Sequence, residues 1–469
     1  MCRKRISLTL FGLLGSLAAP AQFMPGLMSS NYGGIYRTLQ NPSAVVGTRY
    51  TYQLVVAGNS AVSNRYFRRP FTDDYLHTLQ LPYRNDIRRD LQSIGSITEN
   101  PRHTTYTELI GPSLLLSLGK RNAIAVHSRF SNVLYGTGMP RDLTQAYARD
   151  LFSTSVQPTS GAFAASLTQQ HGGELGFTYG LRVFEGRLHR LSVGATVRRL
   201  FGGSYRQLEL SSNYRIDRSQ DGIKTIELNG LSYALYNTNP RAPFRLNAGG
   251  YGTGWAYDLG ATYELGKATT GRAYNDESPF SDPRPAYFLR LSAALMNNGS
   301  GIRYPGPQGY QQQGQAVRVV LDQPALDRFG NDVVAGLPQL APGNAQERPI
   351  EPRTVAMPRR LHLEADLRLT RSVYVNALSM TNLGGAAPQL PDMLIITPRF
   401  EDEDAEFALP ISVIDGNDKL SVGMSARLGP IAFGFSNLSG MLNKNAQHRG
   451  TFAWLGLSVW GVRGVMKNR

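Results

Sequence analysis

The segment from Trp255 to Leu265 alternates strictly between two kinds of side chain. Its odd positions are apolar and its even positions are small, polar or charged, with Trp255, Tyr257, Leu259, Ala261, Tyr263 and Leu265 in the first set and Ala256, Asp258, Gly260, Thr262 and Glu264 in the second. A β-strand points successive side chains to opposite faces, so this segment has one apolar and one polar face. It is also about as long as a tilted strand that crosses a bilayer. The pattern therefore predicts a strand of a membrane-spanning β-barrel.

The same alternation recurs along the chain, for example over residues 174–183, 191–198, 287–295 and 361–369. A soluble β-sandwich also alternates, but its strands average only about five or six residues. A barrel additionally removes the bare strand edges that lipid does not tolerate. No run of 18 apolar residues exists, which excludes an α-helical membrane protein. We predict an all-β fold, a transmembrane antiparallel β-barrel of roughly 14 strands with short helical inserts and long loops.

The first 21 residues have the organisation of a secretory signal. Residues 1–5 are basic, residues 6–18 are apolar, and Ala19 and Ala21 are the small residues that a signal peptidase requires. An N-terminal membrane anchor is the alternative, but the apolar run is too short to span a bilayer. We predict a signal peptide over residues 1–21 and a mature chain from about Gln22. That mature chain has no cysteine, so it has no disulfide and no thiol chemistry.

Residues 22–469 are expected to form a single outer-membrane barrel domain. Within it, residues 22–45 are predicted to be an N-terminal plug-like segment, and residues 298–357, rich in Gly, Pro and Gln, a long loop with one short strand. Apolar residues at helical spacing predict short helical inserts over 86–94 and 140–152. The barrel should resume at Arg360.

The chain is basic, with a formal net charge of +15. Loss of Arg3, Lys4 and Arg5 with the signal peptide leaves 46 basic and 34 acidic residues, a net charge of +12. The basic residues are scattered singly and are not interleaved with stacking aromatics, so we predict no nucleic-acid binding. The expected partners are outer-membrane lipid, anionic glycolipid and an envelope protein.

Charged residues at the polar positions of the predicted strands are candidates to line the barrel lumen. These are Arg182, Arg198, Asp258, Glu264, Arg290, Glu364, Asp366 and Arg368. Because both signs of charge are present, they favour a salt-bridged, closed interior over a wide selective pore.

No catalytic residues, metal site or cofactor are predicted. The seven histidines form no close metal pair, and there is no Walker loop and no GxSxG elbow. His362 is interpreted as a hydrogen-bonding residue of the lumen. The acidic stretch 401–406 is interpreted as a solvated loop tip, with a divalent-cation site as the alternative. Side chains that meet across strands to form a Ser/His/Asp site are a further alternative.

Several short motifs occur in order along the chain. Asn31-Tyr-Gly-Gly-Ile35 and Asn41-Pro-Ser-Ala44 are followed by Leu109–Leu114, Glu174–Tyr179, Tyr257–Tyr263 and Leu428–Leu438. Together they resemble an uncharacterised family of Bacteroidota outer-membrane proteins that is known only as a domain of unknown function, with Asn41–Ala44 as its "NPA" segment. The set is also distantly similar to barrels associated with gliding motility and type IX secretion and to fatty-acid-transporter-like barrels. The resemblance implies a barrel but no substrate or catalytic residues.

These observations predict a non-enzymatic β-barrel protein of the cell outer membrane. Its role is either the passage or uptake of a solute or the structural anchoring of a surface or secretion complex. The alternative is a secreted, soluble β-rich adhesin or binding protein.

Overall fold

The computed structural model describes most of the chain after residue 22. The described residues are 23–67, 103–140, 142–143, 158–186, 188–218, 224–238, 252–266, 287–305, 309–322, 325, 346–384, 388–415, 420–436, 438 and 448–462. The predicted signal peptide and the insert expected over 86–94 lie outside them, as does most of the helix expected over 140–152. Among the described residues, no helix has the length and apolar character needed to cross a membrane.

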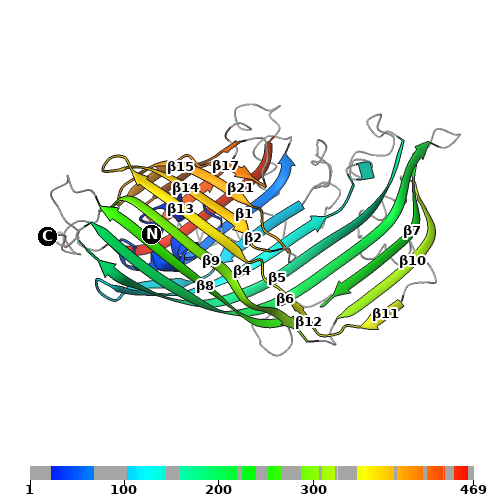
Figure 1. The fold of residues 1–469 in the computed structure, drawn as a ribbon, viewed down its shortest axis with the longest axis horizontal. Coiled ribbons are helices and arrows are strands. Elements are labelled where there is room, and N and C mark those ends of the chain that lie inside the picture. The colour runs from blue at the N-terminus through cyan, green and yellow to red at the C-terminus, as the bar shows by residue number, and fades with distance from the viewer. Residues whose placement is uncertain are drawn as a thin grey trace, which may run out of the picture.

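The strands form a closed antiparallel barrel with 14 positions around its wall (Figure 1). In order, the wall consists of β1 (Tyr50–Phe67), β2 (His103–Ile110) with β3 (Ser113–Ser117), β4 (Asn122–Thr137), β5 (Thr159–Glu185), β6 (His189–Arg218), β8 (Gly252–Gly266), β9 (Tyr287–Tyr304), β13 (Arg360–Arg368), β14 (Val373–Asn382), β15 (Met393–Glu401), β16 (Ala405–Ala408) with β17 (Ile411–Ile414), β18 (Ser421–Val422) with β19 (Met424–Leu428), β20 (Ile431–Phe435) and β21 (His448–Val462). Pairing of β21 with β1 closes the wall, from Tyr50 opposite Val462 to Phe67 opposite His448. The predicted fold class is confirmed.

Two wall positions are made of a broken strand because a proline interrupts the ladder. Pro112 separates β2 from β3, and Pro410 separates β16 from β17. Proline lacks the N–H that a ladder hydrogen bond requires. The chain nevertheless stays in the wall, since β2 and β3 both pair with β4, and β16 and β17 both pair with β15.

A sheet projects beyond the barrel as an extension of two wall strands. β5 and β6 are 27 and 30 residues long, and their outer halves continue past the wall with β7 (Lys224–Asn237) and β10 (Tyr310–Leu321). Figure 1 shows this sheet curving away from the barrel. On it, the hydrogen bond from Arg318 Nε to Glu227, 2.8 Å long, lowers the pKa of the Glu227 carboxyl.

The stretch 298–357 is not the long loop with one short strand that the sequence predicted. It contains the end of β9, all of β10, β11 (Gln346–Pro349) and β12 (Arg353–Val355). Composition suggested a loop because Gly and Gln have low strand propensity. Partner strands overrule that preference: β10 pairs with β7 over its whole length.

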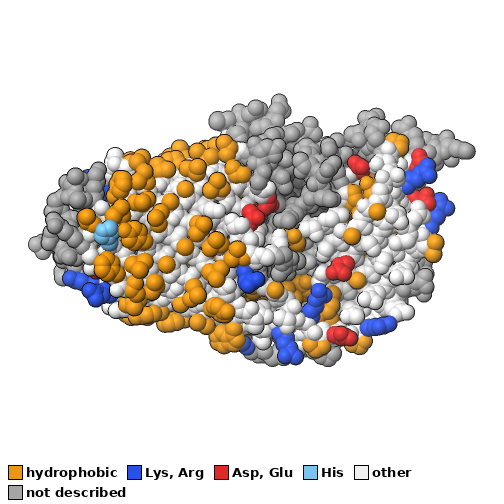
Figure 2. All heavy atoms as spheres, in the orientation of Figure 1, with side chains coloured by type: hydrophobic (Ala, Val, Ile, Leu, Met, Phe, Trp, Pro, Cys, Tyr) orange, Lys and Arg blue, Asp and Glu red, His pale blue; other side chains and the backbone are white. Residues whose placement is uncertain are grey.

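Apolar side chains cover the outside of the barrel. Trp255, Tyr257 and Leu259 are each half exposed, whereas Asp258 between them is 3% exposed. Figure 2 shows the apolar side chains gathered over the barrel wall, while charged side chains are found mainly at its margin and on the projecting sheet. The alternation read from the sequence thus separates an apolar exterior from a polar interior, opposite to the arrangement of a soluble protein.

The N-terminal segment, residues 23–46, is buried inside the barrel. It forms the short helical turns η1 (Leu27–Ser29), α2 (Ile35–Thr38) and η2 (Pro42–Val45), and each of its residues is buried. Asn41 caps η2 by accepting a hydrogen bond from the Ser43 backbone N–H, 3.0 Å long. An apolar cluster joins the segment to the wall through Phe23, Met24 and Ile35 on one side and Val62, Ile110 and Phe452 on the other.

Candidate functional site

A row of three glycines in the wall receives the end of the N-terminal segment. Gly180 on β5 lies opposite Gly194 on β6, which lies opposite Gly260 on β8. A Cβ on Gly180 would overlap Val45 and Val46, and one on Gly194 or Gly260 would overlap Pro42 or Asn41. Glycine inside a strand often marks a close approach of another part of the chain. We call these three residues the glycine row.

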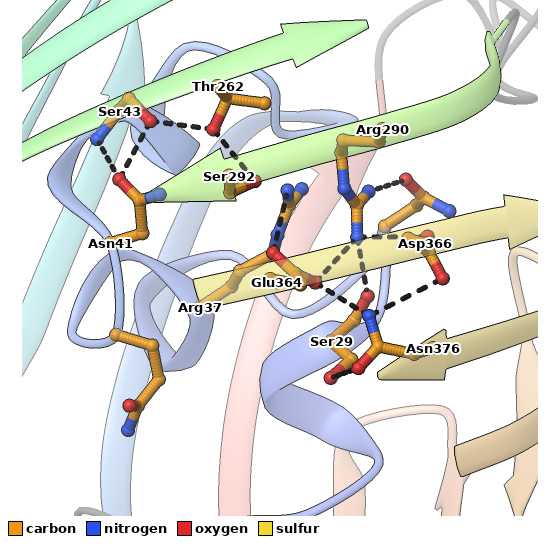
Figure 3. A network of polar contacts seen from close by, with 12 residues as sticks. Ser29, Arg37, Asn41, Ser43, Thr262, Arg290, Ser292, Glu364, Asp366 and Asn376 are labelled. Carbon is orange, nitrogen blue, oxygen red and sulfur yellow. Dashed lines mark hydrogen bonds and ion pairs between the residues drawn. The ribbon is translucent and has the colours of Figure 1, made fainter. Parts of the chain in front are cut away.

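Hydroxyl and amide groups hold η2 against this row (Figure 3). The hydroxyls of Ser43 and Thr262 lie 2.7 Å apart, and Thr262 donates to Ser292 at 3.1 Å. Asn41 accepts a hydrogen bond from the Ser43 hydroxyl at 2.7 Å and donates to the carbonyl oxygens of Ala261 and Ala293. These bonds connect the segment to β8 and β9 without adding it to the sheet.

A buried ion network lies beside η1, at the centre of Figure 3. Arg290 on β9 contacts Glu364 at 3.1 Å and Asp366 at 3.0 Å, both on β13. Arg399 on β15 binds Asp366 in a bidentate manner, at 2.6 and 2.8 Å. Arg290 also donates to the carbonyl oxygen of Ser29 at 2.9 Å. The network therefore links three wall strands to the N-terminal segment.

A second buried network lies on the strands β2 to β8. Arg198 contacts Glu174 at 2.8 Å and Asp258 at 2.7 Å. Arg129 contacts Glu174 at 2.6 Å and Glu108 at 2.8 Å. Removing one partner of such a buried pair leaves an uncompensated charge, which costs about 3–5 kcal/mol. Both networks therefore favour a closed interior.

The eight residues predicted to line the lumen have different environments. Arg198, Asp258, Arg290, Glu364 and Asp366 belong to the two buried networks. Arg182 pairs with Glu185 at 3.1 Å, and Glu264 lies 4.0 Å from Arg190, both at the end of the barrel where β5 is followed by β6. Arg368 is half buried and donates to the carbonyl oxygens of Thr370 and Arg371 in the turn after β13.

The sequence prediction missed several members of the networks. Arg399 and Glu401 occupy inward positions of β15, and Glu401 and Glu406 are 3% and 4% exposed. The two ends of the stretch 401–406 are therefore buried, and the interpretation as a solvated loop tip is wrong for them. Glu401 forms an ion pair with Arg399 and accepts a hydrogen bond from Asn31. Glu406 accepts a hydrogen bond from the Ser30 hydroxyl, 2.5 Å long. The sequence does contain a signal for these inward positions. Polar residues alternate with apolar ones along β15, with Thr397, Arg399 and Glu401 in the first set and Ile396, Pro398 and Phe400 in the second. In the described part of the chain, no cluster of three or more His, Cys, Asp or Glu side chains could hold a metal ion.

Three hollows meet at Asn297, where β9 bulges. Asn297 has a φ of 61°, and the pairing of β8 with β9 shifts register there. Its side chain accepts from Arg198 at 2.7 Å and donates to the carbonyl oxygen of Pro358 at 2.8 Å. It lines an open pocket of about 380 Å³ together with Tyr257 on the outer face. It also lines two inner cavities, of about 20 and 30 Å³.

Fold and site together define a β-barrel whose lumen is occupied by its own N-terminal segment. The chain belongs to the Family of unknown function (DUF5723), whose sequence pattern matches residues 44–437. This agrees with the expected membership of a family without an assigned function. The Bacteroidota origin and the NPA-like assignment stay predictions.

Three solved structures are similar to this chain in the path of the backbone, at low sequence identity. The toluene transporter TbuX of Ralstonia pickettii shares 11% identity, covering 91% of this chain and 94% of its own, with a TM-score of 0.34. A FadL homologue of Pseudomonas aeruginosa shares 10%, covering 93% and 98%, with a TM-score of 0.38. The P. putida toluene transporter TodX shares 11%, covering 92% and 95%, with a TM-score of 0.40. No curated protein matches the chain. Similarity at this level does not bear on the function of this protein.

Proposed function

We propose that this chain is a non-enzymatic β-barrel of the outer membrane through which a small solute passes when the N-terminal segment shifts in the lumen. A closed barrel with half-exposed Trp255, Tyr257 and Leu259 on its outside fits a bilayer. A Sec-type signal, predicted over residues 1–21, would deliver it to the envelope. The basic charge supports contact with anionic outer-leaflet glycolipid.

The observation that carries this proposal is how the N-terminal segment is held. It contacts the wall through side chains, as in the pair Ser43 and Thr262, and no part of it is a strand of the sheet. It can therefore move without breaking a ladder hydrogen bond of the barrel. The glycine row supplies the room that the segment occupies in the closed state. A purely structural barrel would be more simply filled by wall side chains.

The hollows at Asn297 support a route for a solute. The open pocket and the two inner cavities share this side chain, so they lie next to one another across the wall bulge. One inner cavity is lined by Phe23 and Gln40 of the N-terminal segment. A shift of this segment would enlarge that cavity and connect it to the rest of the lumen.

An engineered disulfide tests whether movement of the segment is needed. Ser43→Cys with Thr262→Cys ties the segment to β8, and the hydroxyl contact of 2.7 Å places the two side chains within reach. Thr178→Cys with Thr196→Cys is the matched control, because these hydroxyls also lie 2.7 Å apart but join two wall strands. The single natural cysteine, Cys2, is predicted to leave with the signal peptide, so the mature variants would contain only the two engineered cysteines.

We expect liposome-swelling or planar-bilayer conductance to fall on oxidation of the 43–262 pair and to return on reduction. The conductance of the variant with the 178–196 pair should not change on reduction. Passage that is equal in both redox states of the 43–262 pair would contradict a moving segment. Membranes that stay silent in every state would favour the second candidate, a structural or docking barrel, for which the projecting sheet of β5, β6, β7 and β10 is the supporting feature.

Fractionation separates both candidates from a secreted adhesin. A barrel should appear in the detergent-extracted outer-membrane fraction and migrate faster on a denaturing gel before boiling than after. Recovery from the medium, with mobility that ignores heating, would instead support the soluble alternative.

A further inference from the structure

Two basic side chains of β13 each have one buried nitrogen atom without a hydrogen-bond partner among the described residues. Arg360 and His362 are two residues apart on the strand and therefore lie on the same face. They are 6% and 8% exposed, and both line the inner cavity of about 20 Å³. We call this space the Arg360 cavity.

Arg360 differs from the other buried arginines of the lumen. Arg198, Arg290 and Arg399 each contact two carboxylates. Within the described residues, Arg360 has no carboxylate within 4 Å; its Nη2 donates to the carbonyl oxygens of Met380, at 3.2 Å, and Pro391, at 2.6 Å. Its Nε is buried and, among these residues, has no hydrogen-bond partner. A buried guanidinium without a counter-charge is unfavourable, so this site calls for an anion.

The nearby carboxylates are engaged elsewhere. Asp392 accepts hydrogen bonds from the backbone N–H and the side-chain amide of Asn382, each 2.7 Å long. Asp415 accepts from the backbone N–H of Asp392 at 2.9 Å. Both carboxylates contribute to the electrostatic field at Arg360, but neither forms an ion pair with its guanidinium.

His362 presents a second unused polar atom in the same cavity. Its Nδ1 lies 3.0 Å from the carbonyl oxygen of Gln40, and a carbonyl can only accept, so Nδ1 carries the proton. Its Nε2 is buried and has no hydrogen-bond partner in the part of the chain that the structure describes. A carboxylic acid satisfies both atoms: one oxygen accepts from Arg360 Nε, and the acid's proton passes to His362 Nε2, which then donates to the other, now anionic, oxygen.

The rest of the cavity is largely apolar. Its lining includes Phe23, Met296, Met380, Leu390 and Met393. Methionine is flexible and polarisable, so such a lining adapts to a compact apolar body. A cavity of about 20 Å³ has room for about one water molecule. The body of a ligand therefore fits only after Phe23 and the side chain of Gln40 move, while the Gln40 carbonyl oxygen stays on His362 Nδ1.

We propose that the Arg360 cavity binds a small organic acid, with its carboxylate on Arg360 and His362 and its apolar body on the methionines. This inference rests on the proposed function, because the same shift of the N-terminal segment that allows passage opens the cavity. It deepens that function by naming the chemical class of the solute and the residues that select it.

The test is isothermal titration calorimetry on the purified full chain in detergent, with benzoate as the probe. Benzamide, which has the same body without the charge, and acetate, which lacks the body, are the comparison ligands. The variants are Arg360→Gln, Arg360→Lys and His362→Gln. Arg182→Gln is the matched control, because this arginine pairs with Glu185 away from the cavity. Heat-modifiability verifies that each variant is folded.

We expect wild type to bind benzoate at least tenfold more tightly than benzamide or acetate. Arg360→Gln should lose at least tenfold in benzoate affinity, Arg360→Lys should retain part of it, and Arg182→Gln should match wild type. Equal binding of benzoate and benzamide, or no benzoate binding, would overturn the proposal without the need for any variant. Binding does not require passage. If benzoate binds to the protein but membranes that contain the protein show no conductance, only the proposed function is overturned. Passage of benzoate unchanged by Arg360→Gln would overturn only this inference.

Discussion

Gly260 on β8 lies directly against the side chain of Asn41, with no room for a Cβ between the wall and the N-terminal segment. Asn41 uses its amide there to reach the backbone oxygens of β8 and β9. The closed state of the barrel thus depends on the absence of one side chain in the wall. The predictions below test this fit, the buried charges and the boundary of the apolar surface.

Gly260→Val should displace η2 from the glycine row. The new side chain overlaps Asn41 and Pro42, whereas the strand itself tolerates valine. We expect higher conductance than wild type and faster proteolysis of the N-terminal segment. The control is Ala261→Val, the next residue, whose exposed side chain lies on the outer face. Wild-type conductance in Gly260→Val would mean that the segment does not limit passage.

Asp366→Asn should destabilise the barrel strongly. Asp366 is fully buried and accepts from both Arg290 and Arg399, so the neutral amide leaves buried positive charge uncompensated. We expect a loss of about 3–5 kcal/mol in the free energy of unfolding, measured by guanidinium titration in detergent. Asp217→Asn removes a partner of Arg215 on the projecting sheet, where both side chains are exposed, and should change little. Equal effects of the two substitutions would contradict the role of burial.

Leu259→Arg should impair insertion into a bilayer. Leu259 is 50% exposed on the wall, where a charged side chain facing lipid costs about 2–4 kcal/mol near the membrane centre. Val317→Arg on the projecting sheet should be tolerated, although Val317 is 89% exposed, because we expect this sheet to face water. The measurement is the folded fraction in liposomes, read from the gel shift. If Val317→Arg is the more damaging change, the membrane boundary has been placed wrongly.

Strand period and barrel closure were predictable because they depend on short-range patterns. The alternation around Trp255 and Asp258 determines which side faces out, and a two-residue period leaves little freedom in register. Five of the eight predicted lumen residues occur in the buried networks for the same reason. The row formed by Gly180, Gly194 and Gly260 was not predictable, since three separate strands bring it together.

The contribution of β10 to the projecting sheet was missed for a different reason. Residues 298–357 have a loop-like composition, and pairing with other strands gives parts of this stretch strand structure: β10 pairs with β7 and β11, and β12 pairs with β9. Likewise, the acidic residues Glu401 and Glu406 looked like a solvated tip until Arg399, Ser30 and Asn31 were found beside them. Amino-acid composition indicates only the local preference for strand or loop, whereas strand pairing and burial are properties of the assembled barrel wall.

The sequence by itself determined the all-β barrel, because side-chain alternation over membrane-length strands leaves few other ways to separate apolar from polar faces. Only the tertiary structure decided what fills the lumen and which charges meet there. Contacts between residues far apart in the chain bring the N-terminal segment to the glycine row and, over the described residues, leave Arg360 without a carboxylate partner. Such contacts depend on how the barrel closes, and no local pattern encodes them.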